Sequence, residues 1–326
     1  ALRDPQCRHP FRLGWICGVC MALVALYWVA YTQGGGLAVV GGAGLMAAYL
    51  GLFTGLYAKA QHLLLRRWQD PALLAAPMLW VAQEYALSAG ELGFPWLLLG
   101  HSQAALPRFV QYASVTGVWG VSAWVVGINV LVLLLLRPRL PRRPRLALAA
   151  ALGALVVVPL GHGAAVMASP LPASDRVRVA VVQPNLPWAD TAGGAAVEQT
   201  FLHLEQLSSR AAAAADSLDL IVWPESAVPC YVGLRPECRD RLQALTDRLG
   251  VPLLAGGADF DSQRGESYNA AFLLCPHQQQ LQRYAKMHLV PFGERTPFRD
   301  RLSVLRGVDW SALTGELGPA EFARGT

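Results

Sequence analysis

Long apolar runs dominate the first half of the sequence, and short polar connectors separate them. Each run is close to or above the roughly 20 residues that a helix needs to cross the hydrocarbon core of a bilayer. The pattern therefore predicts a polytopic α-helical membrane bundle in residues 1–170. Its five expected spans are residues 13–31, 38–60, 72–90, 108–136 and 146–168.

The second half alternates between strand-like and helix-like patterns. Short runs rich in Val, Ile and Leu predict strands. Apolar positions at helical spacing predict amphipathic helices between them. This alternation predicts an α/β domain in residues 171–326, with residues 268–275 and 280–285 as a hairpin-like insertion. The three earlier strands are expected at 177–183, 218–223 and 251–255, and the two helices at 195–218 and 237–249.

The connectors between the apolar runs alternate in charge. Arginines precede the first run, follow the second, and gather between Arg137 and Arg145 after the fourth, whereas residues 32–36 carry no charge. Basic connectors favour the cytoplasmic side of a membrane. An odd number of spans then carries everything after Ser169 to the opposite, outer face, without a cleavable signal peptide.

Composition agrees with a membrane protein. Of the 326 residues, 54% are hydrophobic and only 15% are charged, against roughly 25% in ordinary soluble domains. The net charge of +5 comes largely from arginines beside apolar runs, which indicates membrane topology and argues against a nucleic-acid partner. Lysine occurs only at Lys59 and Lys286.

The six cysteines show no metal-ligand pattern, and the sequence predicts neither a metal nor a cofactor. Cys17 and Cys20 lie inside an apolar run, where small packing residues are the simpler interpretation. Cys230 and Cys238 lie in the outer half. In an oxidising compartment they form either a disulfide that closes a short loop or two free thiols.

Candidate chemistry lies at the ends of two predicted strands, where the loops of an α/β sheet converge. Glu225 follows the strand that ends at Trp223, and we expect this apolar setting to raise the pKa of Glu225 toward that of a general base. A turn-capping role is the alternative. Lys286 follows another strand, either as a functional ammonium or as a solvated cation, and His288 is interpreted as a structural histidine.

The connector between the third and fourth runs is unusually apolar. Its Trp96 is either an aromatic-belt residue at the membrane interface or part of a loop that lines a lipid-access cleft. Glu84 lies inside the third run, where a carboxylate requires a partner or water. A structural hydrogen bond to a neighbouring helix is the simpler interpretation.

Taken together, several motifs resemble the nitrilase superfamily of carbon–nitrogen hydrolases and, with the membrane spans, the apolipoprotein N-acyltransferase family. The resemblance covers nearly the whole chain and implies an αββα sandwich for the outer domain. By motif, it implies catalytic roles for Glu225, Lys286 and Glu294. The matching segments are residues 27–29, 93–96, 99–103, 181–185, 223–227, 268–269 and 286–294.

The resemblance also implies substrate contacts for Asn269, Trp96 and Trp188, and a nucleophilic cysteine. None of the six cysteines has the family's context, in which Tyr and Glu closely follow the nucleophile. We therefore expect the nucleophile beyond Thr326, and a fragment that lacks both ends of the family's chain and is inactive by itself.

The implied reaction moves an acyl chain from a phospholipid, through a cysteine thioester, to the N-terminal diacylglyceryl-cysteine of a lipoprotein. Glu225 is expected to act as general base, Lys286 to stabilise the oxyanion, and Glu294 to orient Lys286 or assist proton transfer. The implied setting is a monomer in the bacterial inner membrane, with its catalytic domain on the periplasmic face. The alternatives are a membrane-tethered amidase and a non-catalytic membrane scaffold.

Overall fold

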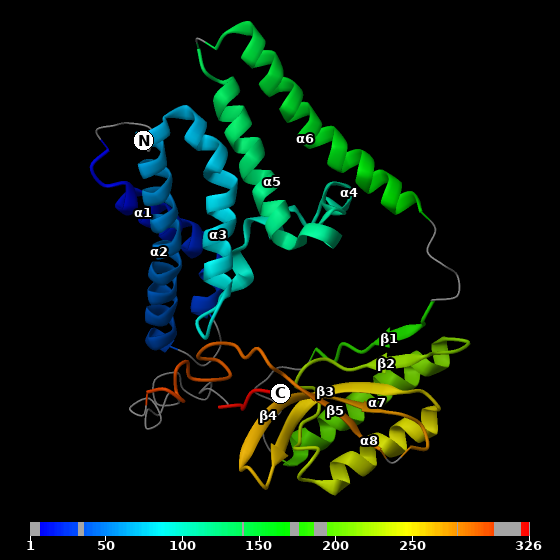
Figure 1. The fold of residues 1–326 in the computed structure, drawn as a ribbon. Helices are drawn as coiled ribbons and strands as arrows, with labels where there is room; N and C mark the ends of the chain where they lie inside the picture. Colours follow the sequence, from blue (N-terminus) through cyan, green and yellow to red (C-terminus); the bar gives the residue numbers. More distant parts are fainter. Residues whose placement is uncertain are drawn as a thin grey trace. The chain divides into compact units, whose positions relative to one another are not determined.

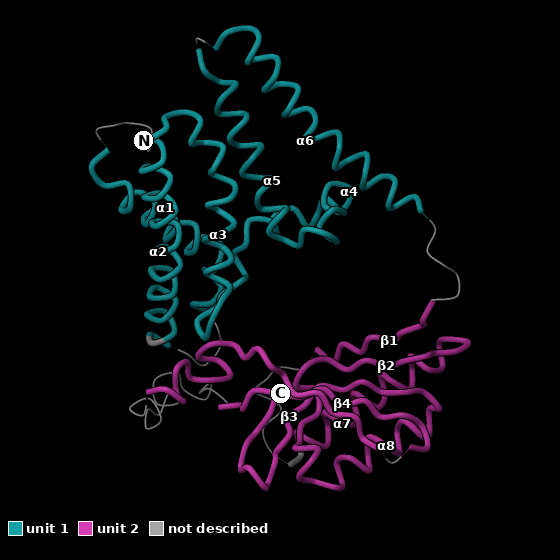
Figure 2. Tube along the Cα trace, in the orientation of Figure 1, with its two compact units in different colours: residues 1–170, 308–318 teal, residues 171–307, 319–326 magenta. Residues whose placement is uncertain are grey.

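The computed structural model describes residues 7–31, 36–138, 140–169, 176–185, 194–278, 280–302 and 321–325. The chain divides into two compact units (Figure 2). Among the described residues, 7–169 belong to unit 1, and 176–302 and 321–325 belong to unit 2.

Unit 1 is helical (Figure 1). Its α-helices are α1 (Pro10–Ala25), α2 (Gly36–Trp68), α3 (Ala76–Ser88), α4 (Pro107–Val110), α5 (Ala113–Leu135) and α6 (Arg142–Ala168). Four short 3-10 helices connect them: η1 (Tyr27–Tyr31), η2 (Asp70–Ala75), η3 (Pro95–Leu97) and η4 (Leu99–Gln103).

Three helices within the described residues, α2, α5 and α6, are long and apolar enough to cross a membrane. The first and third predicted runs instead form α-helices of 16 and 13 residues. The first run continues beyond α1 as η1, and the third begins as η2 before Pro77 starts a new helix. Proline favours a helix start because its missing N–H has no helical partner there anyway.

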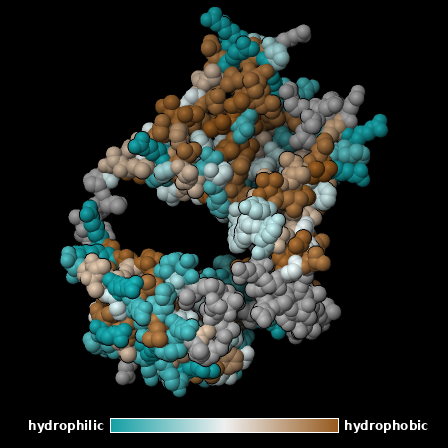
Figure 3. Space-filling view, turned by 180° about the vertical axis from the view of Figure 1, so that it is seen from behind, coloured by the Kyte–Doolittle hydropathy of each residue, from teal (hydrophilic) through white to brown (hydrophobic). Residues whose placement is uncertain are grey.

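The surface of unit 1 is strongly apolar. Hydrophobic side chains gather over its helices in Figure 3, and Val157 and Val158 of α6 are largely exposed. A monomeric soluble protein rarely exposes apolar patches of such extent. This surface fits a hydrocarbon environment, as expected for a membrane protein.

Two glycine pairs allow α1 and α2 to pack closely. A Cβ atom on Gly14 would lie 2.6 Å from the Thr54 carbonyl oxygen, and one on Gly51 would lie 2.9 Å from the Trp15 carbonyl oxygen. With Gly18 and Gly55, these residues form a G-x-x-x-G motif on each helix. Small residues at this spacing are a common contact between membrane helices.

Helix α6 contains a proline that a tryptophan of α5 compensates. Pro159 lacks the N–H that would bond to the Leu155 carbonyl in an uninterrupted helix. The indole N–H of Trp124 donates to that carbonyl oxygen at 2.6 Å. The bond therefore satisfies an orphaned backbone group and ties α5 to α6.

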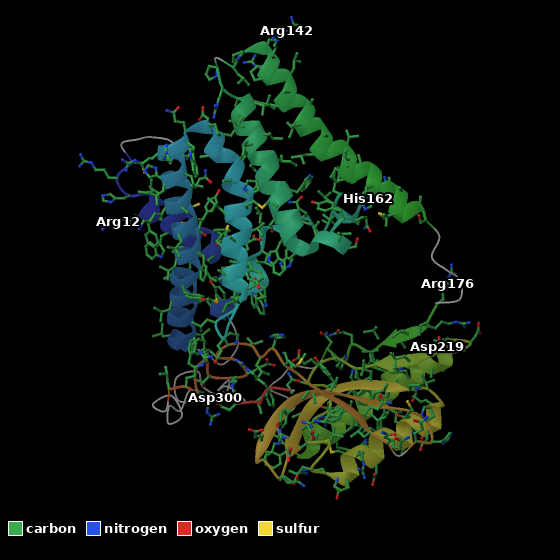
Figure 4. All side chains as sticks on the ribbon, viewed as in Figure 1. Arg12, Arg142, His162, Arg176, Asp219 and Asp300 are labelled. Carbon is green, nitrogen blue, oxygen red and sulfur yellow. A yellow bond between two sulfur atoms is a disulfide. The ribbon has the colours of Figure 1, made fainter. Side chains whose placement is uncertain are left out.

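An ion pair connects the segments that follow the C-terminal ends of α2 and α5, close to the basic residues of both connectors. Asp70, which follows α2, forms an ion pair with Arg137, which follows α5. Arg142 begins α6 after the same connector and is labelled in Figure 4. These basic connectors thus lie at one end of the helical unit, as the charge alternation predicts.

Unit 2 contains one mixed sheet with strand order β1-β2-β3-β4-β5. The first three strands are parallel, with α7 (Gly194–Ala214) and α8 (Pro236–Leu249) as the crossovers, and the last three are antiparallel. The strands are β1 (Val179–Val181), β2 (Leu220–Val222), β3 (Leu253–Asp261), β4 (Glu266–Leu274) and β5 (Gln282–Ala285).

The predicted strand at 251–255 extends much further than expected. Strand β3 runs to Asp261 and pairs with β4 along its whole length. Residues 255–258 are Ala and Gly, which give no β-branched signal, so only the pairing with β4 defines this part of the strand. Strands β4 and β5 pair antiparallel as the predicted hairpin, but they continue the main sheet instead of forming an insertion.

Helices α7 and α8 cover one face of the sheet (Figure 1). Their Leu204 and Leu242 are buried in one cluster with Ile221, Leu253 and Phe272 of the strands. The described residues therefore form one sheet and one helix layer, which is half of the αββα sandwich that the resemblance implies.

Candidate active site

Glu225 lies on a tight turn directly after β2. The backbone N–H of Trp223 still donates to the Leu254 carbonyl at 2.8 Å, and the chain then leaves the sheet at Pro224. It returns when the Val228 N–H donates to the Gly256 carbonyl at 3.0 Å. The turn between these two bonds presents the Glu225 side chain, which is 60% exposed.

Gly256 on β3 allows this turn to pass close to the sheet. A Cβ atom at position 256 would lie 2.6 Å from the Pro224 carbonyl oxygen and 2.7 Å from the Glu225 Cα atom. Side chains essentially never approach backbone atoms so closely. The glycine is thus part of the local structure that positions Glu225.

Further along, the loop that carries Glu225 is attached to unit 2 at two more points. The N–H of Gly233 donates at 2.9 Å to the carboxylate of Asp259, which is buried and also pairs with Arg283 of β5. A disulfide joins Cys230 of the loop to Cys238 in the first turn of α8. Of the two alternatives that the sequence left open, the structure has the disulfide.

Lys286, which directly follows β5, lies next to Asn269 of the adjacent strand β4. The backbone N–H of Lys286 donates to the Asn269 carbonyl at 2.8 Å, one residue beyond the last pair of the β4–β5 ladder. Ala270 and Phe272 of β4 pack in the core on the face that the helices cover. Asn269 precedes Ala270, and successive side chains of a strand point to opposite faces. Asn269 therefore projects from the opposite face of the sheet.

Four side chains form one hydrogen-bonded cluster. The Lys286 ammonium donates to Glu225 Oε1 and to Glu294 Oε1, both at 2.9 Å. The Asn269 amide donates to the same two oxygens, at 2.5 Å to Glu225 and 2.7 Å to Glu294. One ammonium and one amide thus bridge two carboxylates.

Glu294 is the enclosed member of the cluster. Its side chain is 15% exposed, compared with 31% for Lys286. Its second oxygen, Oε2, accepts the backbone N–H of Val290 at 2.7 Å, and the Glu294 N–H donates back to the Val290 carbonyl. Oε1 therefore accepts from Lys286 and Asn269, and Oε2 accepts within the turn itself, so the carboxylate is fixed in place.

Residues 321–325 are bonded through their backbone to the segments that carry the cluster, a feature that the sequence did not predict. The N–H of Phe322 donates to the Glu294 carbonyl at 2.9 Å, and that of Gly325 donates to the Lys286 carbonyl at 3.0 Å. Between them, the Ala323 N–H donates to the Ser267 carbonyl. No local sequence signal identifies this segment, because its partners lie far away in the chain.

The charges of the cluster stabilise one another. The hydrogen bond from Lys286 lowers the pKa of Glu225, aided by Asn269 and opposed by partial burial. Burial by itself lowers the pKa of Lys286, but the hydrogen bonds to Glu294 and Glu225 outweigh it and raise that pKa above its ordinary value. Both groups are therefore ionised across the neutral range.

The expectation of a raised pKa for Glu225 is therefore wrong. Trp223 does not form an apolar wall beside the carboxyl, because its side chain is buried in the core and its indole N–H donates to Ser208 of α7. The nearest strong influence on Glu225 is instead the Lys286 ammonium. The interpretation of Lys286 as a solvated cation is also wrong, since it is paired with two carboxylates.

The remaining predicted residues lie elsewhere. His288 is exposed and outside the cluster, and Trp188 lies outside the described residues. Trp96 belongs to unit 1, where its ring stacks on Trp28 at 5.8 Å and contacts Phe94 at 5.1 Å. It is 51% exposed, so these three rings form an accessible aromatic group at the end of the helices.

Comparison with known families agrees with this architecture. Residues 178–319 match the family described as carbon-nitrogen hydrolase, and residues 2–131 match the apolipoprotein N-acyltransferase N-terminal domain. The chain therefore has an apolar helical unit, followed in sequence by a mixed sheet that carries a Glu and Lys cluster. This organisation defines a membrane protein with a domain of the nitrilase class. The chain belongs to the apolipoprotein N-acyltransferase family.

Individual relatives give the same assignment. The apolipoprotein N-acyltransferase of Chlorobaculum tepidum is 34% identical over 92% of this chain and 59% of its own length. That of Geobacter metallireducens is 32% identical over 90% of this chain and 58% of its own. The chain therefore spans about three fifths of the length of these relatives.

Among solved structures, a carbon-nitrogen hydrolase from Helicobacter pylori G27 aligns over 35% of this chain and 40% of its own, with 19% identity. The TM-score of that alignment is 0.29, which is too low to assign a fold.

Proposed function

We propose that the protein transfers an acyl chain from a phospholipid to the N-terminal diacylglyceryl-cysteine of a lipoprotein. The observation that carries this proposal is the Lys286 ammonium, held between the carboxylates of Glu225 and Glu294 with Asn269 bridging them. Acyl transfer needs a proton acceptor beside the nucleophile and a positive group beside the oxygen that gains charge. Glu225 and Lys286 supply these two groups next to each other.

In the first step, Glu225 accepts the proton of a cysteine thiol as the sulfur attacks the ester carbonyl of the phospholipid. The carbon–sulfur bond forms, the ester carbon–oxygen bond breaks, and the proton passes to the departing lysophospholipid. Because the pKa of Glu225 is lowered, it is a weak base, and the Lys286 ammonium assists by stabilising the negative charge that develops.

In the second step, the α-amino group of the lipoprotein attacks the thioester. A carbon–nitrogen bond forms, the carbon–sulfur bond breaks, and the proton of the amine returns through Glu225 to the sulfur. Glu294 is fixed by the donors Asn269 and Val290. It therefore orients the Lys286 ammonium, which donates to its Oε1. Asn269 fixes the distance between the two carboxylates.

The thiol is assigned through the family resemblance. Cys230 is unsuitable as a substitute although it lies five residues after Glu225, because it is bonded to Cys238. The other described cysteines do not belong to the cluster, and Cys17 and Cys20 lie in helix α1 of unit 1. In the family, Tyr and Glu closely follow the nucleophilic cysteine, and none of the six cysteines of this sequence is followed in that way.

We further propose that the helical unit lies in the bacterial inner membrane, with unit 2 on the periplasmic face and Trp96 near the acyl donor. The basic connectors at one end of the helices support this orientation. Residues 171–326 then act as a separate domain outside the bilayer, and the protein works as a monomer. Trp188 is proposed to contact substrate by the same resemblance.

The test uses the full-length gene product in phospholipid-containing detergent micelles, with a diacylglyceryl lipopeptide as acceptor. Mass spectrometry of the N-acylated lipopeptide gives the rate. We expect Glu225→Gln and Lys286→Ala each to reduce kcat/KM by at least about 100-fold, because the first removes a general base and the second removes an oxyanion donor. Glu237→Gln, which changes an exposed carboxylate of α8, is the matched control and keeps full activity.

The competing interpretation is a membrane-tethered amidase, which would use the same residues with water as acceptor. It predicts ammonia release from small amides and no lipopeptide product. A wild-type protein with neither activity would indicate a non-catalytic scaffold. Near-normal transfer by either site variant, with unfolding temperatures equal to wild type, would remove that residue from the mechanism.

A further inference from the structure

Two buried polar side chains of unit 1 hold the connector between α3 and α4, residues 89–106. Glu84 of α3 is 1% exposed, and its Oε1 accepts the backbone N–H of Leu99 at 2.6 Å and the indole N–H of Trp80 at 2.8 Å. Ser122 of α5 is completely buried, and its hydroxyl oxygen accepts the N–H of Gly100 at 2.8 Å. Two different helices therefore bind two consecutive backbone groups of the connector.

These two N–H groups begin the short helix η4, where the helix itself provides no acceptors. The contact is close as well as polar. A Cβ atom on Gly100 would lie 2.5 Å from the carbonyl oxygen of Val118 in α5. The start of η4 is thus fixed by a carboxylate, a hydroxyl and a backbone-to-backbone contact.

Glu84 is more than a simple cap. Its Oε2 is buried and has no hydrogen-bond partner among the described residues. An unsatisfied oxygen is costly in an apolar setting, and the carboxyl group is kept at this position despite that cost. What the carboxyl group provides is Oε1, on which one donor of α3 and one donor of the connector converge.

The segment that is held in this way carries the aromatic group described above. Trp96 lies three residues before Leu99, and Leu98 between them is buried. Phe94, two residues before Trp96, packs against the helices, and its N–H donates to the Leu87 carbonyl of α3. Release of Leu99 and Gly100 would therefore free one side of the segment on which Trp96 stands.

We propose that Glu84 and Ser122 are positioning residues that hold the connector 89–106 so that Trp96 meets the acyl chain of the donor phospholipid. This inference rests on the proposed function. It predicts that these two residues affect recognition of the phospholipid and not that of the lipopeptide, although neither touches substrate.

The experiment compares Glu84→Ala, Glu84→Gln and Ser122→Ala in the full-length gene product. Ser114→Ala is the matched control, because Ser114 lies on the same helix but bonds only within its own segment. Hydrogen–deuterium exchange measured by mass spectrometry reports on the peptide that covers residues 96–104. Separate titrations of phospholipid and lipopeptide give kcat and each KM.

We expect Glu84→Ala to speed exchange in this peptide by roughly 10- to 100-fold, because it leaves the N–H groups of Leu99 and Trp80 without their acceptor. Ser122→Ala removes a neutral bond and should speed exchange by about 2- to 10-fold. In both variants the KM for phospholipid rises while kcat and the KM for lipopeptide stay within twofold of wild type. Glu84→Gln keeps one acceptor oxygen and recovers part of the loss.

Unchanged exchange in both alanine variants would overturn the anchoring. Faster exchange with an unchanged KM for phospholipid would overturn the positioning role. If the wild-type protein transfers no acyl chain while the variants still exchange faster, the proposed function has failed and the anchoring has not. Ser122→Ala removes only a hydroxyl group and keeps the test valid if Glu84→Ala does not fold.

Discussion

Gly256→Ala tests whether the closeness of β3 to the Glu225 turn matters for catalysis. The added methyl group would lie 2.6 Å from the Pro224 carbonyl oxygen and 2.7 Å from the Glu225 Cα atom. Ordinary contacts of a Cβ atom begin at 3.4 Å, so the turn or the strand must move by 0.7–0.8 Å. Both close contacts are with backbone atoms, which cannot rotate away as a flexible side chain can.

Such a movement is large on the scale of catalytic geometry. A displacement of about 1 Å can cost roughly 100-fold in rate, which corresponds to about 2.7 kcal/mol at 1.36 kcal/mol per tenfold change. Glu225 would shift relative to Asn269 of β4 and to Lys286, which directly follows β5. Overpacking also costs about 1–3 kcal/mol of stability.

The assay measures kcat/KM for acyl transfer together with the unfolding temperature of the same full-length protein. Gly153→Ala on α6 is the control, since a Cβ atom there meets nothing within 4 Å. We expect Gly256→Ala to lose about 100-fold in kcat/KM at a temperature where it remains folded. A kcat/KM within twofold of wild type would refute the argument that this close contact positions Glu225.

Two further predictions concern the surroundings of Glu225. Lys286→Ala removes the main cause that lowers the pKa of Glu225, so that pKa should rise toward its ordinary 4.5, as carboxyl carbon NMR would show. Because the folded pKa is the lower one, the pairing stabilises the fold above about pH 4.5, and this stabilisation is lost as the pH falls through the lowered pKa. An unmoved pKa would contradict the pairing. The disulfide closes a loop with a sequence separation of eight residues. Replacing Cys230 and Cys238 by Ser should therefore lower the free energy of unfolding by about 2.5 kcal/mol, because the unfolded chain regains the entropy of that loop. Identical urea midpoints for this variant and the oxidised wild type would contradict a stabilising disulfide.

Local patterns in the sequence were enough to predict the organisation of the molecule. The apolar runs predicted a helical unit, and the alternation of strand and helix patterns predicted the α/β unit with its first three strands. Strand ends at Trp223 and Ala285 drew attention to Glu225 and Lys286. These features depend on local periodicity and on proline and charge signals, which can be read within a window of a few turns.

The way in which distant residues meet depends on long-range strand pairing. Glu225 and Lys286 are 61 positions apart, and only the pairing of β2, β3, β4 and β5 brings them to one hydrogen bond. The same pairing reversed the expected direction of the Glu225 pKa, because it placed an ammonium where the sequence suggested an indole. Gly256 and residues 321–325 act through close contacts and backbone bonds to segments far along the chain. Such contacts depend on register between strands, which no local pattern in these segments specifies.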